Sequence, residues 1–386
     1  MNDAERDALR RREFPWSSDT IYLNHASTGP LPERTLRALA EFDRRRATPF
    51  TISDPDLFQI LDRGRELVGR IINADSAEIA LSINTTYGLN IAAAGLPLEA
   101  GDVVVVSDRE FPANVYPWLR LEQRGVTLEL VPTTPEGWPD EAYLLTRCAD
   151  PRVKVLAVSL VQFSNGYQVD LEQLSRVTRA TNTWLVVDAI QGIGQTPVDL
   201  KATPVDVLSA GAQKWLLSPW GSGFTCIRRE LIPILEPAVV SWMSFAGTDD
   251  FTRLTEYDAT LRQDARRFEL ITLPYQDFVG MNQSLELVLE VGIGEIAAHL
   301  AQLQQPLLAW ADRRGVRVAS PRDTHRSGII CLAVPNPAQV HQSLRAAGII
   351  TSLREGAIRI SPHFYTTMGE IERVVGVLDS VVGRGA

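Results

Sequence analysis

The stretch Trp184-Leu-Val-Val-Asp188-Ala-Ile-Gln191-Gly192 points to the fold class more clearly than any other part of the chain. Its first four residues are apolar and do not alternate with polar residues, which is typical of a strand buried on both faces of a parallel sheet. Asp188 follows these residues directly, at the carboxyl end of the strand. Ligands bind at this edge of an open α/β sheet, so the stretch predicts an acid that faces a ligand. The ordinary alternative is a salt bridge from Asp188 to a neighbouring loop.

Short apolar runs of the same kind lie on both sides of this strand, and helical patterns separate several of them. Leu171–Thr181 is the clearest helical pattern, with Asp170 near its N-terminus. Strands that alternate with helices indicate parallel crossovers, so we expect an α/β fold with a mostly parallel sheet. The strands are predicted at Val103–Ser107, Thr127–Val131, Val153–Leu160, Thr183–Asp188, Val205–Ala210 and Gly223–Arg228.

The pattern changes after about residue 275. A long helix is predicted over Gln283–Leu303, and the mixture of short strands and helices that follows indicates a smaller α+β lobe. We predict a large α/β domain over residues 31–275 and a small C-terminal domain over residues 276–386, with residues 1–30 packed against the small domain. The other elements of the small domain are predicted at Ile329–Val334, Gln339–Ala347, Ile349–Leu353, Ala357–Ser361 and from Thr367 onward.

Composition and charge exclude several classes of function. The net charge of −9 argues against nucleic acid or an anionic membrane surface as the main partner, and no apolar run is long enough to span a membrane. The N-terminus is charged and unlike a signal peptide, and the three cysteines are widely spaced, which fits a reducing cytoplasm. Neither the cysteines nor the five histidines show a metal-binding pattern, so no metal is expected.

Lys214 is one of only three lysines, beside Lys154 and Lys201, among 38 basic residues. Arginine replaces lysine as a surface charge but cannot readily lose a proton to attack a carbonyl, so each lysine is a candidate for amine chemistry. A general bias toward arginine is the ordinary alternative. Lys214 follows Asp188 by 26 residues, with one predicted strand between them, so the two side chains are expected at neighbouring strand ends. Pyridoxal phosphate needs both groups: an amine for its aldehyde and an anion for its ring nitrogen.

Two further segments supply what this cofactor needs. Thr85 and Thr86 lie at the predicted start of a helix, where free backbone N–H groups and the helix dipole attract phosphate. The alternative is that these threonines only cap the helix. Phe111 follows a predicted strand and is placed to stack on a pyridine ring, although a role in the core is the alternative.

With these segments in this order, the chain resembles the class V aminotransferase family of pyridoxal-phosphate enzymes, which have the PLP-dependent transferase fold type I. Within the family it resembles the isopenicillin N epimerase-like and cysteine desulfurase-like branch. The resemblance covers nearly the whole chain. It rests on seven segments: Tyr22-Leu-Asn-His-Ala-Ser-Thr-Gly-Pro, Asn84-Thr-Thr-Tyr-Gly-Leu-Asn, Glu110-Phe-Pro-Ala-Asn-Val-Tyr-Pro-Trp, Val187-Asp-Ala-Ile-Gln, Gln213-Lys-Trp, Arg267-Phe-Glu-Leu-Ile-Thr272-Leu-Pro and Arg359-Ile-Ser-Pro-His-Phe-Tyr.

The resemblance implies a role for each residue of the cofactor site. It implies that Lys214 forms a Schiff base with the cofactor and later moves protons at the substrate Cα. The other implied contacts are Asp188 with the ring nitrogen, Gln191 near the phenolic oxygen, Phe111 on the ring, Thr85, Thr86 and Gln213 around the phosphate, and Gln162 near the substrate or the ring oxygen.

The resemblance also implies a substrate site and a dimer. Arg359 matches the arginine that binds the substrate α-carboxylate, with Arg354 as the alternative, and His25 is placed near the substrate. Thr272 resembles a residue that the second subunit donates to the phosphate, which implies a homodimer with shared active sites.

The chain departs from the cysteine desulfurases in two places. Those enzymes carry a mobile cysteine in a loop before the carboxylate-binding arginine, but Ile350–Arg359 contains none. They also have histidine at the position of Gln213. A classical desulfurase is therefore disfavoured, and the motifs around Glu110 and Arg354 look most similar to the isopenicillin N epimerase-like branch.

Two reaction types begin with removal of the Cα proton by Lys214: epimerisation and β-elimination of the C–S lyase type. Epimerisation needs a second acid, for which Tyr87, His25 and His363 are candidates. Transamination is the alternative reaction. A protein of this fold that only binds would typically have lost Lys214 or Asp188, and a nicotinamide dehydrogenase would need a complete G-x-G-x-x-G motif, which is absent.

Overall fold

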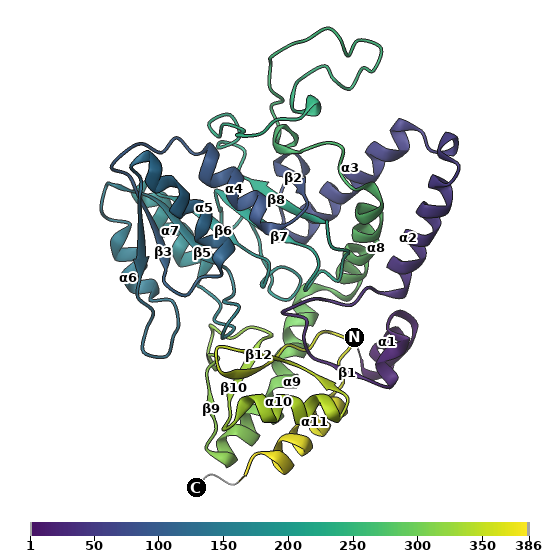
Figure 1. Cartoon of the computed structure of the whole chain (residues 1–386), viewed down its shortest axis with the longest axis vertical. Helices are drawn as coiled ribbons and strands as arrows, with labels where there is room; N and C mark the ends of the chain where they lie inside the picture. Colours follow the sequence, from purple (N-terminus) through teal and green to yellow (C-terminus); the bar gives the residue numbers. More distant parts are fainter. Residues whose placement is uncertain (1, 384–386) are drawn as a thin grey trace.

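A seven-stranded sheet forms the centre of the computed structural model, which describes residues 2–383 (Figure 1). The strands lie in the order β2-β8-β7-β6-β5-β3-β4. Only β8 is antiparallel to its neighbours in this sheet of the described residues, so β2 runs in the same direction as the other five strands. The strand bounds are Ile79–Ser82 for β2, Val103–Ser107 for β3, Thr127–Val131 for β4, Val153–Ser159 for β5, Trp184–Asp188 for β6, Val207–Gly211 for β7 and Gly223–Ile227 for β8.

This sheet confirms the predicted α/β fold with a mostly parallel sheet. Successive side chains of β6 enter different apolar clusters: Leu185 and Val187 lie in one, and Val186 lies in the other. Both faces of the strand are therefore covered, which explains why its sequence lacks polar alternation. The sequence pattern did not predict β2, whose four residues are too few to show a period.

Helices cover the sheet and place the ends of its strands. α4 (Thr85–Gly95) packs on β7 and β8, and α7 (Leu171–Thr181) packs on β6. α3 (Asp54–Ile72) lies against β2 and, together with α2 (Glu33–Arg46), against α8 (Tyr275–Val291). The two short helices of this unit are α5 (Tyr116–Leu119) and α6 (Glu141–Arg147).

The C-terminal unit is built on a four-stranded antiparallel sheet of order β12-β13-β10-β9 (Figure 1). The N-terminal segment lies against this unit, because β1 (Ile21–Tyr22) pairs in parallel with β11 (Ile349–Ile350) and Arg10 of α1 forms an ion pair of 2.6 Å with Glu370. The remaining bounds are Asp3–Glu13 for α1, Ile293–Arg314 for α9, Arg317–Val318 for β9, Ile330–Ala333 for β10, Pro337–Ala346 for α10, Ser352–Arg354 for β12, Ala357–Ile360 for β13 and Met368–Val381 for α11.

The prediction of one long helix over Gln283–Leu303 is wrong. The chain forms two helices, α8 and α9, which are separated at Gly292. Gly292 has a φ of +86°, a backbone conformation that glycine adopts without a steric cost. α8 packs on α2 and α3, whereas α9 packs on α11, so the break lets consecutive apolar segments cover different units.

No helix of residues 2–383 has the length and apolar character that a membrane crossing requires. Within the same residues, no three side chains of His, Cys, Asp or Glu are grouped so that they could hold a metal ion.

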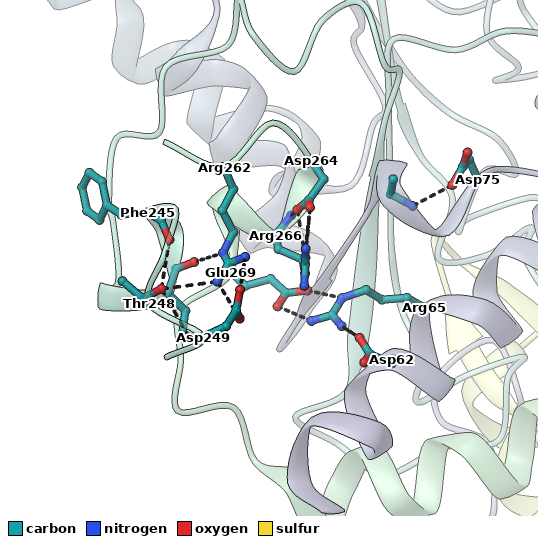
Figure 2. Close-up of polar contacts among 12 residues, drawn as sticks. Asp62, Arg65, Asp75, Phe245, Thr248, Asp249, Arg262, Asp264, Arg266 and Glu269 are labelled. Carbon is teal, nitrogen blue, oxygen red and sulfur yellow. Dashed lines mark hydrogen bonds and ion pairs between the residues drawn. The ribbon is translucent and has the colours of Figure 1, made fainter. Parts of the chain in front are cut away.

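A buried ion pair joins α3 to the segment after β8 (Figure 2). Arg65 of α3 donates to Glu269 through Nε at 2.9 Å and Nη2 at 2.6 Å, and Leu81 donates its backbone N–H to the same carboxylate at 2.8 Å. Arg262 and Asp249 form a second ion pair (Figure 2). This pair lies at the base of residues 245–261, a segment that projects from the large α/β unit (Figure 1). Glu269 thus helps to hold the strand end from which α4 departs.

Replacement of Arg65 by methionine should lower the free energy of unfolding by about 3–5 kcal/mol, because Glu269 is left buried without its cation. The matched control is Arg45→Met, which removes an exposed ion pair with Asp56 and should cost less than about 1 kcal/mol. Chemical denaturation of both variants measures the difference. Equal, small losses would show that the buried pair is not a stabilising element.

Candidate active site

Polar side chains gather at the edge where the parallel strands end. Ser82 ends β2, Ser107 ends β3, Ser159 ends β5 and Asp188 ends β6, and all four are buried. Lys214 lies three residues after β7, the strand next to β6. The predicted meeting of an acid and an amine at neighbouring strand ends therefore follows from the sheet order.

The pKa values of Asp188 and Lys214 are both shifted in the direction that favours the neutral form. Burial raises the pKa of Asp188 to about 7, the negative charge of Glu110 adds to this, and Lys214 opposes it. Burial lowers the pKa of Lys214 to about 8, against the effect of Asp188, and the positive charge of Arg359 adds to this lowering. Within residues 2–383 the Lys214 amine has no hydrogen bond or ion pair. A partly unprotonated, unpaired amine is suited to nucleophilic attack and proton transfer.

An aromatic face lies beside this amine. Lys214 Nζ is 5.9 Å from the centre of the Phe111 ring, which is 46% exposed. Phe163 packs edge-on against Phe111, with ring centres 5.2 Å apart. Phe111 is therefore not a core residue, and its ring is open to a ligand.

The start of α4 is tied to the strand that precedes Lys214. Thr85 Oγ1 accepts a hydrogen bond of 2.8 Å from the backbone N–H of Gly211, and Ser209 Oγ donates to the carbonyl oxygen of Thr85 at 3.0 Å. The helix cap is Asn84, which accepts from Tyr87 N at 2.9 Å, so the alternative of threonine capping is wrong. The first-turn N–H groups at Thr85 and the exposed Thr86 suit a phosphate.

Gln191 and Gln213 connect the lysine loop to the N-terminal segment. Gln191 donates to the carbonyl oxygen of Ala26 at 2.9 Å and accepts from Trp215 Nε1 at 2.9 Å. The backbone oxygen of Gln213 accepts from Gly29 N at 2.7 Å, and a Cβ on Gly29 would lie 2.2 Å from the carbonyl oxygen of Lys214. Only glycine permits this approach. The roles of Gln191 at the phenolic oxygen and of Gln213 at the phosphate stay predictions.

Arg359 is a buried cation without an acidic partner. Its guanidinium donates to Ser27 Oγ at 2.7 Å, to the carbonyl oxygen of Phe163 at 2.8 Å and to Ser352 Oγ at 3.1 Å. Among the described residues no carboxylate pairs with it, and burial lowers its pKa to about 10. Arg354 is exposed and lies 3.4 Å from the same Ser27 hydroxyl. A buried guanidinium with only neutral partners is suited to an anionic ligand.

Ser27 is a residue of this site that sequence reasoning missed. It lies inside the motif Tyr22–Pro30, which gave the only signal. Glu110, the residue before Phe111, is a second residue of this site that the sequence pattern alone did not predict. Thr272 is exposed in the described chain, so its contact with a second subunit stays a prediction.

His25 does not have a free nitrogen for a substrate. It is completely buried; its Nδ1 lies 2.8 Å from the carbonyl oxygen of Ser361 and its Nε2 lies 2.8 Å from the hydroxyl of Tyr365. Burial also lowers its pKa, which favours a neutral ring. The expectation that His25 contacts the substrate is therefore corrected: its ring joins the N-terminal segment to the C-terminal unit.

The other two candidates for a second acid also have protein partners. His363 is buried, with Nε2 at 3.0 Å from the carbonyl oxygen of Trp215 and Nδ1 accepting from Phe364 N at 2.9 Å. Burial lowers the pKa of His363 to about 4. The Tyr87 hydroxyl donates to the carbonyl oxygen of Phe268 at 2.8 Å, and burial raises its pKa to about 12. None of these groups is a ready proton donor to a ligand.

All three cysteines are buried. Burial raises the pKa of Cys331 to about 12 and of Cys148 to about 11, and it also raises the pKa of Cys226. The Cys331 thiol donates to the carbonyl oxygen of Ser164 at 3.2 Å. Sulfur transfer needs an accessible thiolate, which these positions do not provide.

The residues at this edge fit pyridoxal phosphate. Ser82 Oγ, Ser107 Oγ and Gln162 Oε1 are buried and have no hydrogen-bond partner among the described residues. Buried polar atoms are rarely left unpaired, so these three indicate a polar ligand at the strand ends. An unpaired amine, a carboxylate without a cation, an open aromatic face and a helix N-terminus match the aldehyde, ring nitrogen, ring and phosphate of the cofactor.

Known proteins of similar sequence point to the same group. A sequence profile described as Aminotransferase class-V matches residues 21–374. The chain is 28% identical to a probable cysteine desulfurase of Methanothermobacter thermautotrophicus, over 97% of this chain and 98% of the relative. It is 27% identical to isopenicillin N epimerase of Streptomyces clavuligerus, over 94% of this chain and 95% of the relative. The apo structure of a cysteine desulfurase from Thermococcus onnurineus NA1 shares the fold, with a TM-score of 0.87, 23% identity and coverage of 99% of this chain and 98% of that chain.

Replacement of Asp188 by asparagine should stabilise the cofactor-free protein above neutral pH. Because the folded-state pKa of Asp188 is raised, its ionisation costs stability as pH rises from about 4 and the cost is complete above about 7. The variant should gain roughly 2–4 kcal/mol at pH 8 and nothing at pH 4. Thermal unfolding at both pH values measures this, with the exposed Asp19→Asn as control. A variant less stable than wild type at pH 8 would contradict the assignment of Asp188 as a strained, buried anion.

Proposed function

Since the chain belongs to the aminotransferase class-V family of pyridoxal-phosphate enzymes, we propose that it acts on an α-amino acid by β-elimination of the C–S lyase type. The family assignment confirms pyridoxal phosphate as the cofactor and fold type I as the fold. The observation that carries the proposal is the half-buried, unpaired Lys214 amine near the buried Asp188 carboxylate.

In this proposal, each part of the cofactor has a residue that binds it. Asp188 offers the anion for the ring nitrogen, Phe111 offers the face for the ring, and Thr85 and Thr86 offer the phosphate site. Gln213, Gln191 and Gln162 are the nearby amide groups. When bound, the cofactor withdraws electrons from the substrate and so eases loss of the Cα proton.

Lys214 removes the Cα proton in this proposal. Its side chain is half-buried and its amine has a pKa of about 8, so a substantial fraction is neutral near pH 7–8 and able to accept a proton. Asp188 would keep its negative charge once a cationic ring nitrogen faces it, because an opposite charge favours the ionised carboxylate.

Arg359 binds the α-carboxylate of the substrate in this proposal. Its planar guanidinium already has three neutral hydrogen-bond acceptors, which fix its orientation, and no carboxylate of the described protein competes for its charge. Bidentate pairing with a carboxylate is the strongest contact that such a group makes. Arg354 lies close enough to Ser27 to assist from the exposed side.

The surroundings of the candidate acids favour elimination over epimerisation. Elimination needs one base at Cα and a leaving group at Cβ, whereas epimerisation needs a second group to return the proton to the opposite face. Tyr87, His25 and His363 all have protein partners and shifted pKa values that oppose this role. The buried cysteines argue against desulfurase chemistry. Transamination is the second candidate, because Lys214 alone suffices to move its protons.

The homodimer with shared sites is part of the proposal. Thr272 is exposed, and the projecting segment of residues 245–261 carries exposed apolar side chains such as Leu254 and Tyr257 (Figure 1). A surface of this kind is typical of a subunit contact. The three free cysteines support a reducing, cytoplasmic location.

Lys214→Ala should abolish covalent attachment of the cofactor. The purified protein is loaded with pyridoxal phosphate, reduced with borohydride, digested and analysed by mass spectrometry. The wild type and the control Lys201→Ala should carry the cofactor mass on the peptide that contains Lys214, because a secondary amine forms there. An equally labelled Lys214→Ala variant would overturn the assignment of this lysine.

Product analysis decides the reaction. With S-conjugates of cysteine, elimination should release a thiol, pyruvate and ammonia in equal amounts, at a rate that falls to background in Lys214→Ala. A D-amino acid instead of pyruvate would establish epimerisation. Dependence on an added keto acid, with formation of a new amino acid, would establish transamination.

A further inference from the structure

Glu110 is a buried carboxylate that the proposed reaction does not yet use. It follows β3 and precedes Phe111, and it is 6% exposed. Its oxygens accept from Ser159 N at 2.8 Å, from the Ser159 hydroxyl, from Gln162 Nε2 at 2.6 Å and from Asn114 Nδ2 at 3.2 Å. Within residues 2–383 it has no cationic partner.

Glu110 lies close to the acid of the cofactor site. Ser159, which supplies two of its hydrogen bonds, is the register partner of Asp188 on the neighbouring strand. Burial raises the pKa of Glu110, and the hydrogen bonds from Ser159, Asn114 and Gln162 oppose this by favouring the ionised form. Four hydrogen-bond donors therefore stabilise the Glu110 carboxylate close to a second buried acid, Asp188.

One of these donors fixes the orientation of Gln162. A carboxylate accepts hydrogen bonds and does not donate them, so the amide nitrogen of Gln162 must face Glu110 and its carbonyl oxygen must lie on the other side. That oxygen, Oε1, is buried and has no donor among the described residues. An acceptor of this kind costs free energy until a donor binds to it.

Gln162 also lies between the two halves of the proposed site. The next residue, Phe163, packs against the Phe111 ring and accepts a hydrogen bond from Arg359 through its carbonyl oxygen. The Gln162 backbone is held by Tyr167 O, which accepts from Gln162 N at 2.8 Å, and by Gly166 N, which donates to Gln162 O at 2.9 Å. The side-chain oxygen is thus placed by both its backbone and its amide nitrogen.

We propose that Glu110 is a positioning residue for the proposed function: by accepting the amide N–H of Gln162, it makes Gln162 present only a hydrogen-bond acceptor to the bound molecules. Gln162 then selects a ligand group that carries an N–H or O–H. That donor is either the ring hydroxyl of pyridoxal phosphate or the amino group of the substrate.

The test compares Glu110→Gln with Gln162→Met and with the double variant. Glu110→Gln keeps the shape but offers an amide that competes for the same orientation, so Gln162 can turn its N–H₂ toward the ligand. Gln162→Met keeps the approximate volume and removes the acceptor. Asn114→Ala is the matched control, since it removes a donor to Glu110 without reorienting Gln162.

Binding of pyridoxal phosphate to the cofactor-free protein is measured by equilibrium titration. If the donor is the ring hydroxyl, Glu110→Gln and Gln162→Met should each weaken binding about 10-fold or more, and a cofactor analogue without that hydroxyl should bind wild type and variants alike. If the donor is the substrate amine, cofactor affinity stays unchanged while the KM for the amino acid rises about 10-fold with little change in kcat. Both patterns support the proposal.

The double variant separates positioning from a merely structural role. If Glu110 acts through Gln162, the Glu110→Gln change should have little further effect once Gln162 is methionine. Additive losses, or unchanged affinity and KM in both single variants, would overturn the proposal. Should Glu110→Gln not fold, Gln162→Met carries the test alone, and unchanged cofactor affinity and KM would again overturn it. Labelling of Lys214 in the wild type reports on the proposed function independently.

Discussion

The burial of three charged groups without matched partners is the constraint on which the rest of this structure depends. Asp188 and Arg359 are buried and Lys214 is half-buried, and the loss of water shifts each pKa in the direction that favours the neutral form of the group. Such an arrangement costs stability in the absence of a ligand and is retained where a ligand compensates it. A cationic ring nitrogen, an aldehyde and a substrate carboxylate would supply the three missing partners.

The fold holds these groups in place with parts that are distant along the chain. β6 and β7 place Asp188 and the lysine loop side by side, while the N-terminal segment crosses this loop through Gly29 and supplies Ser27 to Arg359. The buried rings of His25 and His363 join the same segment and loop to the C-terminal unit. The ring nitrogens of both histidines contact other protein groups. Lys214 is therefore the base that the geometry favours in the proposed reaction.

The preference for elimination over the other reactions follows from which side chains already have hydrogen-bond partners within the protein or are buried. Only epimerisation needs a proton donor on the opposite face of the substrate Cα. The three candidate donors, His25, Tyr87 and His363, already have hydrogen-bond partners within the protein. A mobile thiol is needed only in desulfuration, and the three cysteines are buried. Glu110 contributes to ligand selection in the proposed site, because its hydrogen bond with the Gln162 amide nitrogen determines which end of that amide faces the ligand.

Periodicity and motif order were enough to predict the parallel sheet, the acid at the end of β6, the amine after β7 and the family, because these depend on residues that are near one another in sequence or follow a fixed order. They failed for Gln283–Leu303, where Gly292 lets the chain change units, and for His25, whose burial no local pattern reveals. They also missed Ser27 and Glu110. Glu110 is held by Ser159, which lies 49 positions away in the sequence, and Ser27 is held by Arg359, which lies 332 positions away. Only the packing of the folded chain could therefore identify these two side chains as part of the site.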